Sequence, residues 1–446
     1  MKKILQKLIF TFLGCITMTN AGILNSKIIT IKNGMQVVVV ENNIAPTVSV
    51  AMAYKVGTAD DPSHIIGVSH FLEHMMFKGT KKVPGDKFIK TVLLHGGSAN
   101  AFTSYDYTVY TTDIAKEFLE IILELEADRM TNLSFNKEEV ESEKKVVQEE
   151  RLMRIGNNPI GSAHEAILKN LFWYHNYGIH PIGYPHHIDA YNYENTFEHY
   201  KKWYAPNNAV LILSGRITIE EAEKLAEKYF GDIKKSKSIP IRKRVEEPHH
   251  GGVIAKIEQE SDRLKSNIYM VEYAAPNHDQ PSGKISSDNY LPLIIVSHYL
   301  AGNEKGVLYQ RLVEEKELAI DAGSSFGEAS IDPSTFGISA TLSKGVSFDE
   351  ISSEINIVVK NLIKNGISKE DIDRCVNEIE SSYAFSRDGN SGTIYMLIPI
   401  LCGIPLEDID NFPSRLKSVT VEQINKSIKL LFNEKPIVEA RLSPKK

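Results

Sequence analysis

The segment that most constrains the fold is a charged stretch in the middle of the chain, KKSKSIPIRKRVEEPHHGG at residues 234–252. It lacks apolar periodicity and holds two prolines and two glycines, a composition typical of a linker. Because single cores rarely grow beyond about 250–300 residues, a chain of 446 residues is expected to form two. The sequence therefore predicts two nearly equal halves, 22–240 and 253–446, joined by a linker at 241–252.

The two halves show similar patterns. Each begins with strand-like residues, MQVVVVENN in the first and SNIYMVEYAAP in the second, and continues into helical stretches. Both also carry a similar histidine-containing stretch, GVSHFLEH from Gly67 and IIVSHYLAGNEKGVLYQRL from Ile294, which hints at an internal duplication. We expect an α+β fold of two similar halves, each a mostly antiparallel sheet packed with helices.

The N-terminus, MKKILQKLIFTFLGCITMTNAG, differs in character from the rest. Lysines precede an apolar run that ends in small or polar residues, which predicts a signal peptide at residues 1–21 and an exported, periplasmic or otherwise extracytoplasmic protein. The alternative is a membrane anchor, although the run is short for a bilayer. Lipid attachment at Cys15 is a further alternative.

Charge and cysteine content narrow the function classes. The net charge is −6 and there is no phosphate-binding loop, so nucleic acid is not an expected partner. Beyond Cys15, the remaining cysteines are Cys375 and Cys402, which could pair in an oxidising compartment but specify no disulfide scaffold. The fold must depend on its hydrophobic cores.

The stretch GVSHFLEHMMFKGT at 67–80 combines helical periodicity with two histidines and a glutamate. Helix start signals precede it at 61–63. One face collects apolar side chains that are expected to pack inward: Ile65, Val68, Leu72, Met75 and Met76. The opposite side collects His70, Glu73 and His74, because positions three and four apart are neighbours on a helix.

This triplet fits metal-assisted hydrolysis. Two imidazoles one turn apart can each place a nitrogen about 2.0–2.1 Å from one zinc ion, and the carboxylate between them can reach a zinc-bound water without binding the metal. The alternative is a solvated helix face that carries two histidines by chance. A third ligand would decide between the two interpretations.

The reversed order His-x-x-Glu-His is the mark of inverzincins, and the chain resembles the pitrilysin and insulin-degrading enzyme family, including the mitochondrial processing peptidases. The stretch ESEKKVVQEERLMR resembles the family's second zinc helix. The resemblance implies that Glu150 joins His70 and His74 as the third zinc ligand and that Glu143 supports the ligands. Glu143 and Glu150 are seven residues apart and nearly eclipsed on a helix, whereas Glu149 would point about 100° away.

A further stretch, LHGGSANAFTSYDYTVYTTDI at 94–114, resembles the family's Gly-Gly-x-x-Asn-Ala-x-Thr segment. The resemblance implies an exposed edge strand beside the zinc, to which a peptide adds as another strand, with Asn100 and Ala101 holding the scissile region. Without the zinc helix, the same residues would indicate a plain edge strand after a turn. WYAPNNAVLILSGRI at 203–217 and HPIGYP at 180–185 also match family segments.

The second half departs from the family pattern. Active single-chain relatives carry an Arg and a Tyr in a stretch like LREKxGLAY, and these bind the developing oxyanion. The equivalent here is LVEEKELAI, with Val313 and Ile320 at those positions. Losing one oxyanion donor costs about 10²–10³ in rate. Arg311 is a poor substitute, because two residues turn a helical side chain by about 200°.

These observations together predict a zinc-dependent endopeptidase with one Zn²⁺ per chain. The first half would be the catalytic domain and the second a homologous, non-catalytic domain. Glu73 would take a proton from the zinc-bound water and return it to the leaving amine. A related subunit without the zinc motif, or a second copy, would supply the missing Arg and Tyr and close as a clam shell around a peptide or unfolded segment.

Two alternatives stay open at this point. One is a non-catalytic structural or assembly subunit of the same fold, which Val313 and Ile320 favour and the intact zinc motif opposes. The other is a solitary zinc-binding or zinc-storage protein, which would not need Glu73. The neighbouring pairs His186–His187 and His249–His250 lie in loop-like sequence and are expected at the surface.

Overall fold

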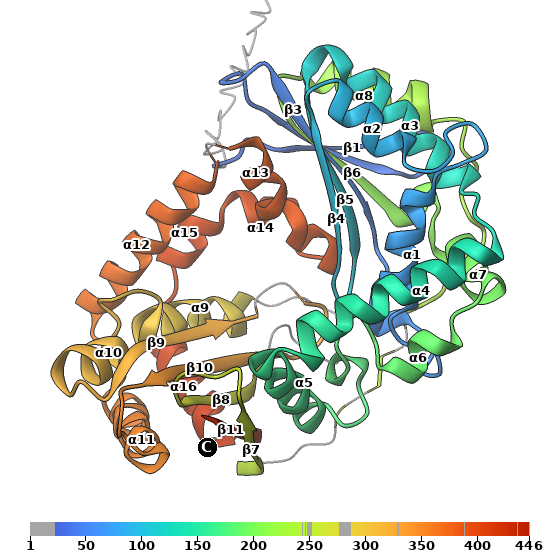
Figure 1. The fold of residues 1–446 in the computed structure, drawn as a ribbon. Helices are drawn as coiled ribbons and strands as arrows, with labels where there is room; N and C mark the ends of the chain where they lie inside the picture. Colours follow the sequence, from blue (N-terminus) through green and yellow to red (C-terminus); the bar gives the residue numbers. More distant parts are fainter. Residues whose placement is uncertain are drawn as a thin grey trace, which may run out of the picture.

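The structure is a computed structural model that describes residues 23–242, 244–245, 247, 252–275, 287–327, 330–387, 389–434 and 436–445. Figure 1 shows two halves, each a sheet with its helices, coloured blue to green and yellow to red. The expected signal peptide at 1–21, including Cys15, lies outside the described residues, and so does the pair His249–His250. None of the described helices has the length and apolar character needed to cross a bilayer.

The first sheet has six strands in the order β1-β2-β6-β3-β5-β4. Their bounds are β1 (Lys27–Thr30), β2 (Gln36–Glu41), β3 (Thr47–Tyr54), β4 (Ser98–Thr103), β5 (Thr108–Ala115) and β6 (Ala209–Gly215). β2 is buried on both faces, because Val37 and Val39 face one hydrophobic core while Val38 and Val40 face another. β4 lies at the free edge, where the resemblance placed a substrate strand.

Most helices of the first half pack against one face of this sheet, whereas α5 packs against the second sheet (Figure 1). They are α1 (Val68–Met75), α2 (Lys87–Leu94), α3 (Leu119–Asn132), α4 (Lys137–Arg151), α5 (Pro159–Leu171), α6 (Pro185–Ala190), α7 (Tyr193–Trp203) and α8 (Ile219–Phe230). Short turns are η1 (Thr58–Asp60), η2 (Met76–Lys78), η3 (Lys116–Phe118), η5 (Asn176–Gly178), η6 (Pro206–Asn208) and the π-helix η4 (Leu152–Gly156).

The second sheet has five strands in the order β7-β11-β8-β10-β9. Their bounds are β7 (Gly252–Ser261), β8 (Ile268–Ala275), β9 (Ala319–Phe326), β10 (Ser334–Leu342) and β11 (Pro436–Pro444). The helical elements are α9 (Ser287–Ala301), α10 (Val307–Tyr309), the π-helix η7 (Gln310–Glu315), α11 (Phe348–Asn365), α12 (Lys369–Arg387), α13 (Asn390–Leu397), η8 (Ile398–Cys402), α14 (Leu406–Asp410), α15 (Phe412–Lys417) and α16 (Val421–Glu434).

The two sheets have equivalent topologies, which supports the duplication suggested by the sequence. In the first, β6 is parallel to β2 and antiparallel to β3; in the second, β11 is parallel to β7 and antiparallel to β8. The order β3-α1-β4-β5-α3-α4 corresponds to β8-α9-β9-β10-α11-α12. The expected fold of two similar α+β halves is confirmed.

Each half covers a sheet face of the other. Ile167 and Leu171 of α5 pack with Val438 and Leu442 of β11. Conversely, α13 and η8 of the second half pack against β3 and β6 of the first sheet, and Leu397 belongs to the core between them. The halves are thus interlocked by a reciprocal exchange of helices.

The described part of the linker also joins the two halves. Arg242 Nη2 lies 2.9 Å from Asp60 Oδ2. Arg244 Nη2 lies 2.7 Å from Asp106 Oδ1, and its Nε lies 3.2 Å from Asp332 Oδ2. Asp60 and Asp106 belong to the first half and Asp332 to the second, and the side chains of all three are buried. The charged linker is therefore held in place by ion pairs.

The two described cysteines are free and buried. Cys375 of α12 belongs to the core of the second half, whereas Cys402 of η8 belongs to the core that covers the first sheet. No disulfide supports the fold among the described residues.

Candidate active site

Helix α1 begins at Val68, later than the start signals in the sequence suggested. Its N-cap is Gly67, with φ of 95°, a left-handed conformation that glycine adopts at little cost. Asp61 acts as a start signal across the intervening turn, because its Oδ2 accepts hydrogen bonds from the N–H groups of Gly67 at 2.7 Å and Ser69 at 3.3 Å. The helix start is thus set by a buried carboxyl group six residues before its N-cap.

A buried polar chain continues from Asp61 to α7. The Ser69 hydroxyl donates to Asp61 Oδ1 at 2.6 Å, and His199 Nε2 lies 2.9 Å from the Ser69 oxygen. Burial raises the pKa of Asp61 to about 7 and lowers the pKa of His199 to about 3. His199 is therefore neutral at pH 7. Because the Ser69 hydroxyl already donates to Asp61, His199 donates to Ser69 through Nε2–H. Ser69 directly precedes the expected ligand His70.

The two faces of α1 divide as the periodicity predicted. Val68, Leu72 and Met75 are fully buried in the core of the first half. The other side presents His70, Glu73 and His74, although His70 and Glu73 are themselves mostly buried. The polar side of this helix is therefore an enclosed site and not a solvated face.

Helix α4 supplies the two further acids. Its N-cap Asn136 accepts a hydrogen bond from the N–H of Glu139 in a capping box. The buried side chain of Val147 fixes which side of the helix faces the core, and this turns Glu143 and Glu150 toward α1. Glu149 is exposed.

The three expected ligand atoms converge on one point. Glu150 Oε2 lies 3.5 Å from His70 Nε2 and 3.3 Å from His74 Nε2. Two ligands of a tetrahedral zinc, each at about 2.0–2.1 Å from the ion, are separated by roughly 3.3 Å, so the distances fit one zinc ion. Glu150 Oε2 is buried with no hydrogen-bond partner among the described residues, as an oxygen that binds a metal would be.

Neighbouring charges orient His74 and set the ionisation of the cluster. His74 Nδ1 lies 2.9 Å from Glu143 Oε1, and Lys78 Nζ pairs with the other oxygen of Glu143. Burial alone would lower the pKa of His74, but its contacts with Glu143 and Glu150 outweigh burial and raise it to about 9. Burial, with a smaller contribution from His74, lowers the pKa of His70 to about 3.

Glu73 lies between the two imidazoles in the sequence but is held by the edge strand. Thr103 Oγ1, at the end of β4, donates a hydrogen bond to Glu73 Oε2 at 2.5 Å. Burial raises the pKa of Glu73 to about 7, while Thr103, His74 and the positive charge of Arg154 act in the opposite direction. A carboxyl group in this range can exchange protons near neutral pH.

Asn100 and Ala101 lie in β4, which pairs with β5 along one side only. Asn100 Oδ1 accepts a hydrogen bond from the N–H of Ala101 at 2.9 Å. The strand contacts α1, and Thr103 at its end reaches Glu73, so β4 lies beside the helix that carries His70 and His74.

The prediction for the pair His186–His187 is wrong in part. Both residues lie in helix α6 and not in a loop, and His187 is buried while His186 is exposed. Adjacent helical residues point about 100° apart, so one of the pair turns inward. His187 Nδ1 accepts a hydrogen bond from the N–H of Tyr184, which makes it part of the helix cap.

In the second half, the stretch that lacks the family's Arg and Tyr lies away from the cluster. Val313 is partly buried against the second core, and Ile320 is 61% exposed on the edge strand β9. Arg311 pairs with Glu354 at 3.0 Å and with Glu315 at 3.1 Å.

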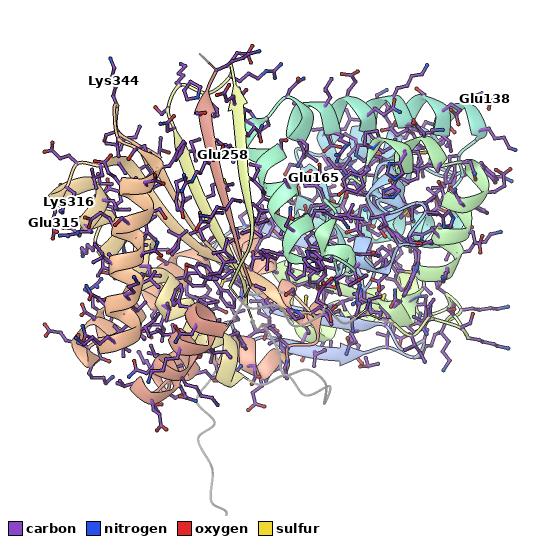
Figure 2. The ribbon with its side chains drawn as sticks, turned by 90° about the horizontal axis from the view of Figure 1, so that it is seen from below. Glu138, Glu165, Glu258, Glu315, Lys316 and Lys344 are labelled. Atoms are coloured by element: carbon purple, nitrogen blue, oxygen red, sulfur yellow. The ribbon has the colours of Figure 1, made fainter. Side chains whose placement is uncertain are left out.

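Figure 2 shows how far apart these regions are. Glu315 and Lys316 lie at the outer edge of the second half, whereas Glu165 lies near the middle of the molecule. Glu165 binds Arg151, which follows the expected ligand Glu150 directly. Residues 312–320 therefore do not approach the cluster of their own chain.

Sequence reasoning missed three side chains at the site: Lys78, Thr103 and Arg154. Lys78 follows the zinc motif in FKGT, and Thr103 ends the segment that was compared with the family's edge strand. Arg154 Nε lies 2.8 Å from Glu150 Oε1 in the π-helix η4. For Arg154, the spacing of four residues from Glu150 was a usable signal, since such pairs are neighbours on a helix.

This fold and this donor set define a class of protein: two duplicated α+β halves with three side chains that could hold one divalent metal beside a carboxylate. Residues 36–181 match the family described as Insulinase (Peptidase family M16), and residues 190–379 match its Peptidase M16 inactive domain. The chain belongs to peptidase family M16, as the resemblance implied.

One relative is similar over most of the chain and another over about half of it. It is 27% identical over 399 residues to the zinc protease PqqE of Helicobacter pylori, covering 89% of this chain and 88% of that protein. It is 28% identical over 209 residues to a probable mitochondrial-processing peptidase subunit beta of Schizosaccharomyces pombe, covering 46% and 45%.

Solved structures share the fold. A protease from Helicobacter pylori matches with a TM-score of 0.86 and 25% identity, over 94% of this chain and 99% of that chain. Pitrilysin matches with a TM-score of 0.72 and 19% identity, over 93% of this chain and 44% of its own. At 19% identity, the match to pitrilysin shows a shared fold alone.

Proposed function

We propose that the protein is a zinc-dependent endopeptidase that uses His70, His74 and Glu150 as metal ligands. The convergence of these three side chains from two helices, with Glu73 beside them, carries the proposal. Among the described residues, they form the one group of His, Cys, Asp and Glu side chains with metal-binding spacing. Residues 22–240 are the catalytic domain, and residues 253–446 form its non-catalytic counterpart behind the linker 241–252.

A zinc ion in this site would lower the pKa of a bound water and polarise the peptide carbonyl. Glu73 then serves as the proton carrier, because its carboxyl group can accept a proton near pH 7 and pass it to the leaving amine. Thr103 holds one oxygen of Glu73 and leaves the other for this exchange. Glu143 orients His74 through Nδ1, which leaves Nε2 on the side of Glu150, where it would hold a metal.

The substrate is a peptide or an unfolded segment bound along β4. A strand added at a free edge is held by its backbone, which allows many sequences to bind. Asn100 and Ala101 lie on this strand and would hold the scissile region, once the peptide replaces the local bond between them.

The oxyanion-binding Arg and Tyr come from a second subunit in this proposal. Two observations support it: Val313 and Ile320 stand at the matched positions, and the stretch that holds them lies far from the cluster in its own chain (Figure 2). The pitrilysin chain is about twice as long as the part that this chain matches, which leaves room for a second unit of this size. The partner is a related subunit without the zinc motif, or a second copy.

We also propose that the protein is exported, on the basis of the predicted signal peptide at 1–21. The relative PqqL of Escherichia coli is described as a periplasmic protease, which is consistent with this location. An N-terminal membrane anchor is the alternative.

The test is to purify the protein with whatever accompanies it and to measure zinc content and peptide hydrolysis. We expect about one zinc per chain, loss of hydrolysis on chelation, and loss of hydrolysis with retained zinc in Glu73→Gln. Full activity of Glu73→Gln would exclude the proposed mechanism. A non-catalytic assembly subunit, the second candidate, would hold no zinc at this site and would copurify with a larger complex.

A further inference from the structure

Arg154 lies at the metal site but is not needed as a ligand. It follows Glu150 by one turn, and its Nε lies 2.8 Å from Glu150 Oε1. The other oxygen, Oε2, is the one that faces both imidazoles. The Arg154 side chain is 61% exposed, and its ion pair among the described residues is with Glu150. Glu150 therefore contacts the two imidazoles through Oε2 and the exposed guanidinium group of Arg154 through Oε1.

The other basic groups on this side of the site are already neutralised or neutral. Arg151 binds Glu165 through two nitrogens at 2.9 Å each. Burial lowers the pKa of His180 to about 4 and also lowers the pKa of His164, so neither carries a charge at pH 7. Of these four basic residues, Arg154 is therefore the one that is both charged and able to donate further hydrogen bonds.

The backbone at Arg154 is held firmly. Gly161 of α5 lies so close that a Cβ there would be 2.3 Å from the Arg154 carbonyl oxygen. Arg263, from the turn between β7 and β8, donates to the carbonyl of Asn157 at 2.6 Å. The turn between η4 and α5 is therefore fixed from both halves of the molecule, and a guanidinium held at Nε presents its two terminal nitrogens in a defined direction.

We propose that Arg154 binds a carboxylate group of the peptide substrate close to the scissile bond. The proposal rests on the proposed peptidase function. With Nε engaged by Glu150, the two terminal nitrogens form the end-on fork that receives a carboxylate through two parallel hydrogen bonds. The carboxylate belongs either to an acidic side chain or to the C-terminus of the peptide, and both offer the same chemistry. A lysine or arginine at the same position would be repelled.

The test measures peptide binding in a Glu73→Gln background, so that it does not depend on hydrolysis. Zinc-loaded protein, with its partner if one copurifies, is titrated against fluorescent peptides that differ at one position: Glu, Gln or Lys, each amidated, and the Gln peptide with a free C-terminus. We expect the Glu peptide, the free-acid peptide or both to bind about tenfold or more tightly than the amidated Gln peptide. Adding Arg154→Gln should abolish the difference.

The controls separate the alternatives. Arg216→Gln removes one exposed positive charge far from the cluster in sequence and should leave the preference unchanged. Zinc content must stay near one per chain in Arg154→Gln, because otherwise the effect passes through Glu150. Equal binding of all four peptides by the Glu73→Gln protein, or an equal loss for all four on adding Arg154→Gln, would overturn the proposal. Absence of zinc or of hydrolysis in the wild type would instead count against the peptidase function.

Discussion

Thr103 donates a hydrogen bond to Glu73 across the gap between the edge strand β4 and the zinc-motif helix α1. The strand proposed to hold the peptide therefore also holds the proposed general base. Binding of a substrate strand and placement of the proton carrier depend on the same element, which couples peptide registration to chemistry.

Thr103→Val should remove this hydrogen bond with little change in shape. A hydrogen bond to a charged group contributes about 1.5–3 kcal/mol, so we expect kcat/KM to fall about tenfold or more. Zinc content should not change, because Thr103 does not contact a ligand. Thr103→Ser keeps the hydroxyl and should retain most of the activity. Equal losses in both variants would mean that packing, and not the hydroxyl, matters.

Three glutamates of α4 provide a matched set of variants that tests the proposed metal site. Glu150→Gln should cause the largest loss of zinc affinity, because it weakens one of three ligands. Glu143→Gln should weaken zinc binding about 10–100-fold, since it disturbs the bond that orients His74. Glu149→Gln should have no effect, because this residue is exposed. Competition with a chromogenic chelator measures all three, and a loss in Glu149→Gln equal to that in Glu150→Gln would refute the ligand assignment.

The position of Glu317 carries local backbone strain. Its φ is 52°, and it occupies the place of the glycine in the family stretch that LVEEKELAI resembles. A left-handed conformation costs a non-glycine residue about 1–2 kcal/mol, partly offset by the entropy that glycine loses on folding. Glu317→Gly should therefore raise the free energy of unfolding by about 0.5–1 kcal/mol. Lys316→Gly, at φ of −104°, is the control and should lower it. Denaturant unfolding distinguishes the two.

The sequence predicted those features that depend on local periodicity. The helical period separated Val68, Leu72 and Met75 from His70 and His74, and the spacing of seven residues put Glu143 and Glu150 on one side of α4. The strands β2, β6 and β8 were visible because most of their side chains are apolar. These patterns are set by neighbours within one element, so one sequence contains them.

Contacts between distant elements could not be predicted in this way. Thr103 contacts Glu73 only because β4, at the edge of the sheet, lies beside α1. Asp61 caps α1 from six residues before the N-cap Gly67, whereas an ordinary capping residue occupies the N-cap position itself. The exchange of α5 and α13 between halves leaves no local mark either, since an apolar helix face does not reveal which sheet it covers. The linker arginines, which indicated only a charged linker in the sequence, form ion pairs with aspartates of both halves.

Glu272 gives a prediction for the pH dependence of stability. It lies in β8 on the face that packs against α5, beside Val438, and burial raises its pKa to about 7 from 4.5. Between these values the folded protein holds a proton that the unfolded chain has lost. The contribution of Glu272 to the free energy of unfolding therefore falls as pH rises from about 4.5 to about 7, by about 3 kcal/mol in total.

Glu272→Gln isolates this contribution, because glutamine has nearly the same shape and does not titrate. The variant and the wild type should be about equally stable at pH 4, and the variant should become more stable as pH rises, with the full difference reached above pH 7. Denaturant unfolding of both proteins across this range measures the difference, and other titrating groups cancel in the comparison. Two parallel stability curves would show that the Glu272 carboxyl group is solvated or paired in the folded protein, contrary to the burial of its side chain and the absence of a partner for Oε2 among the described residues.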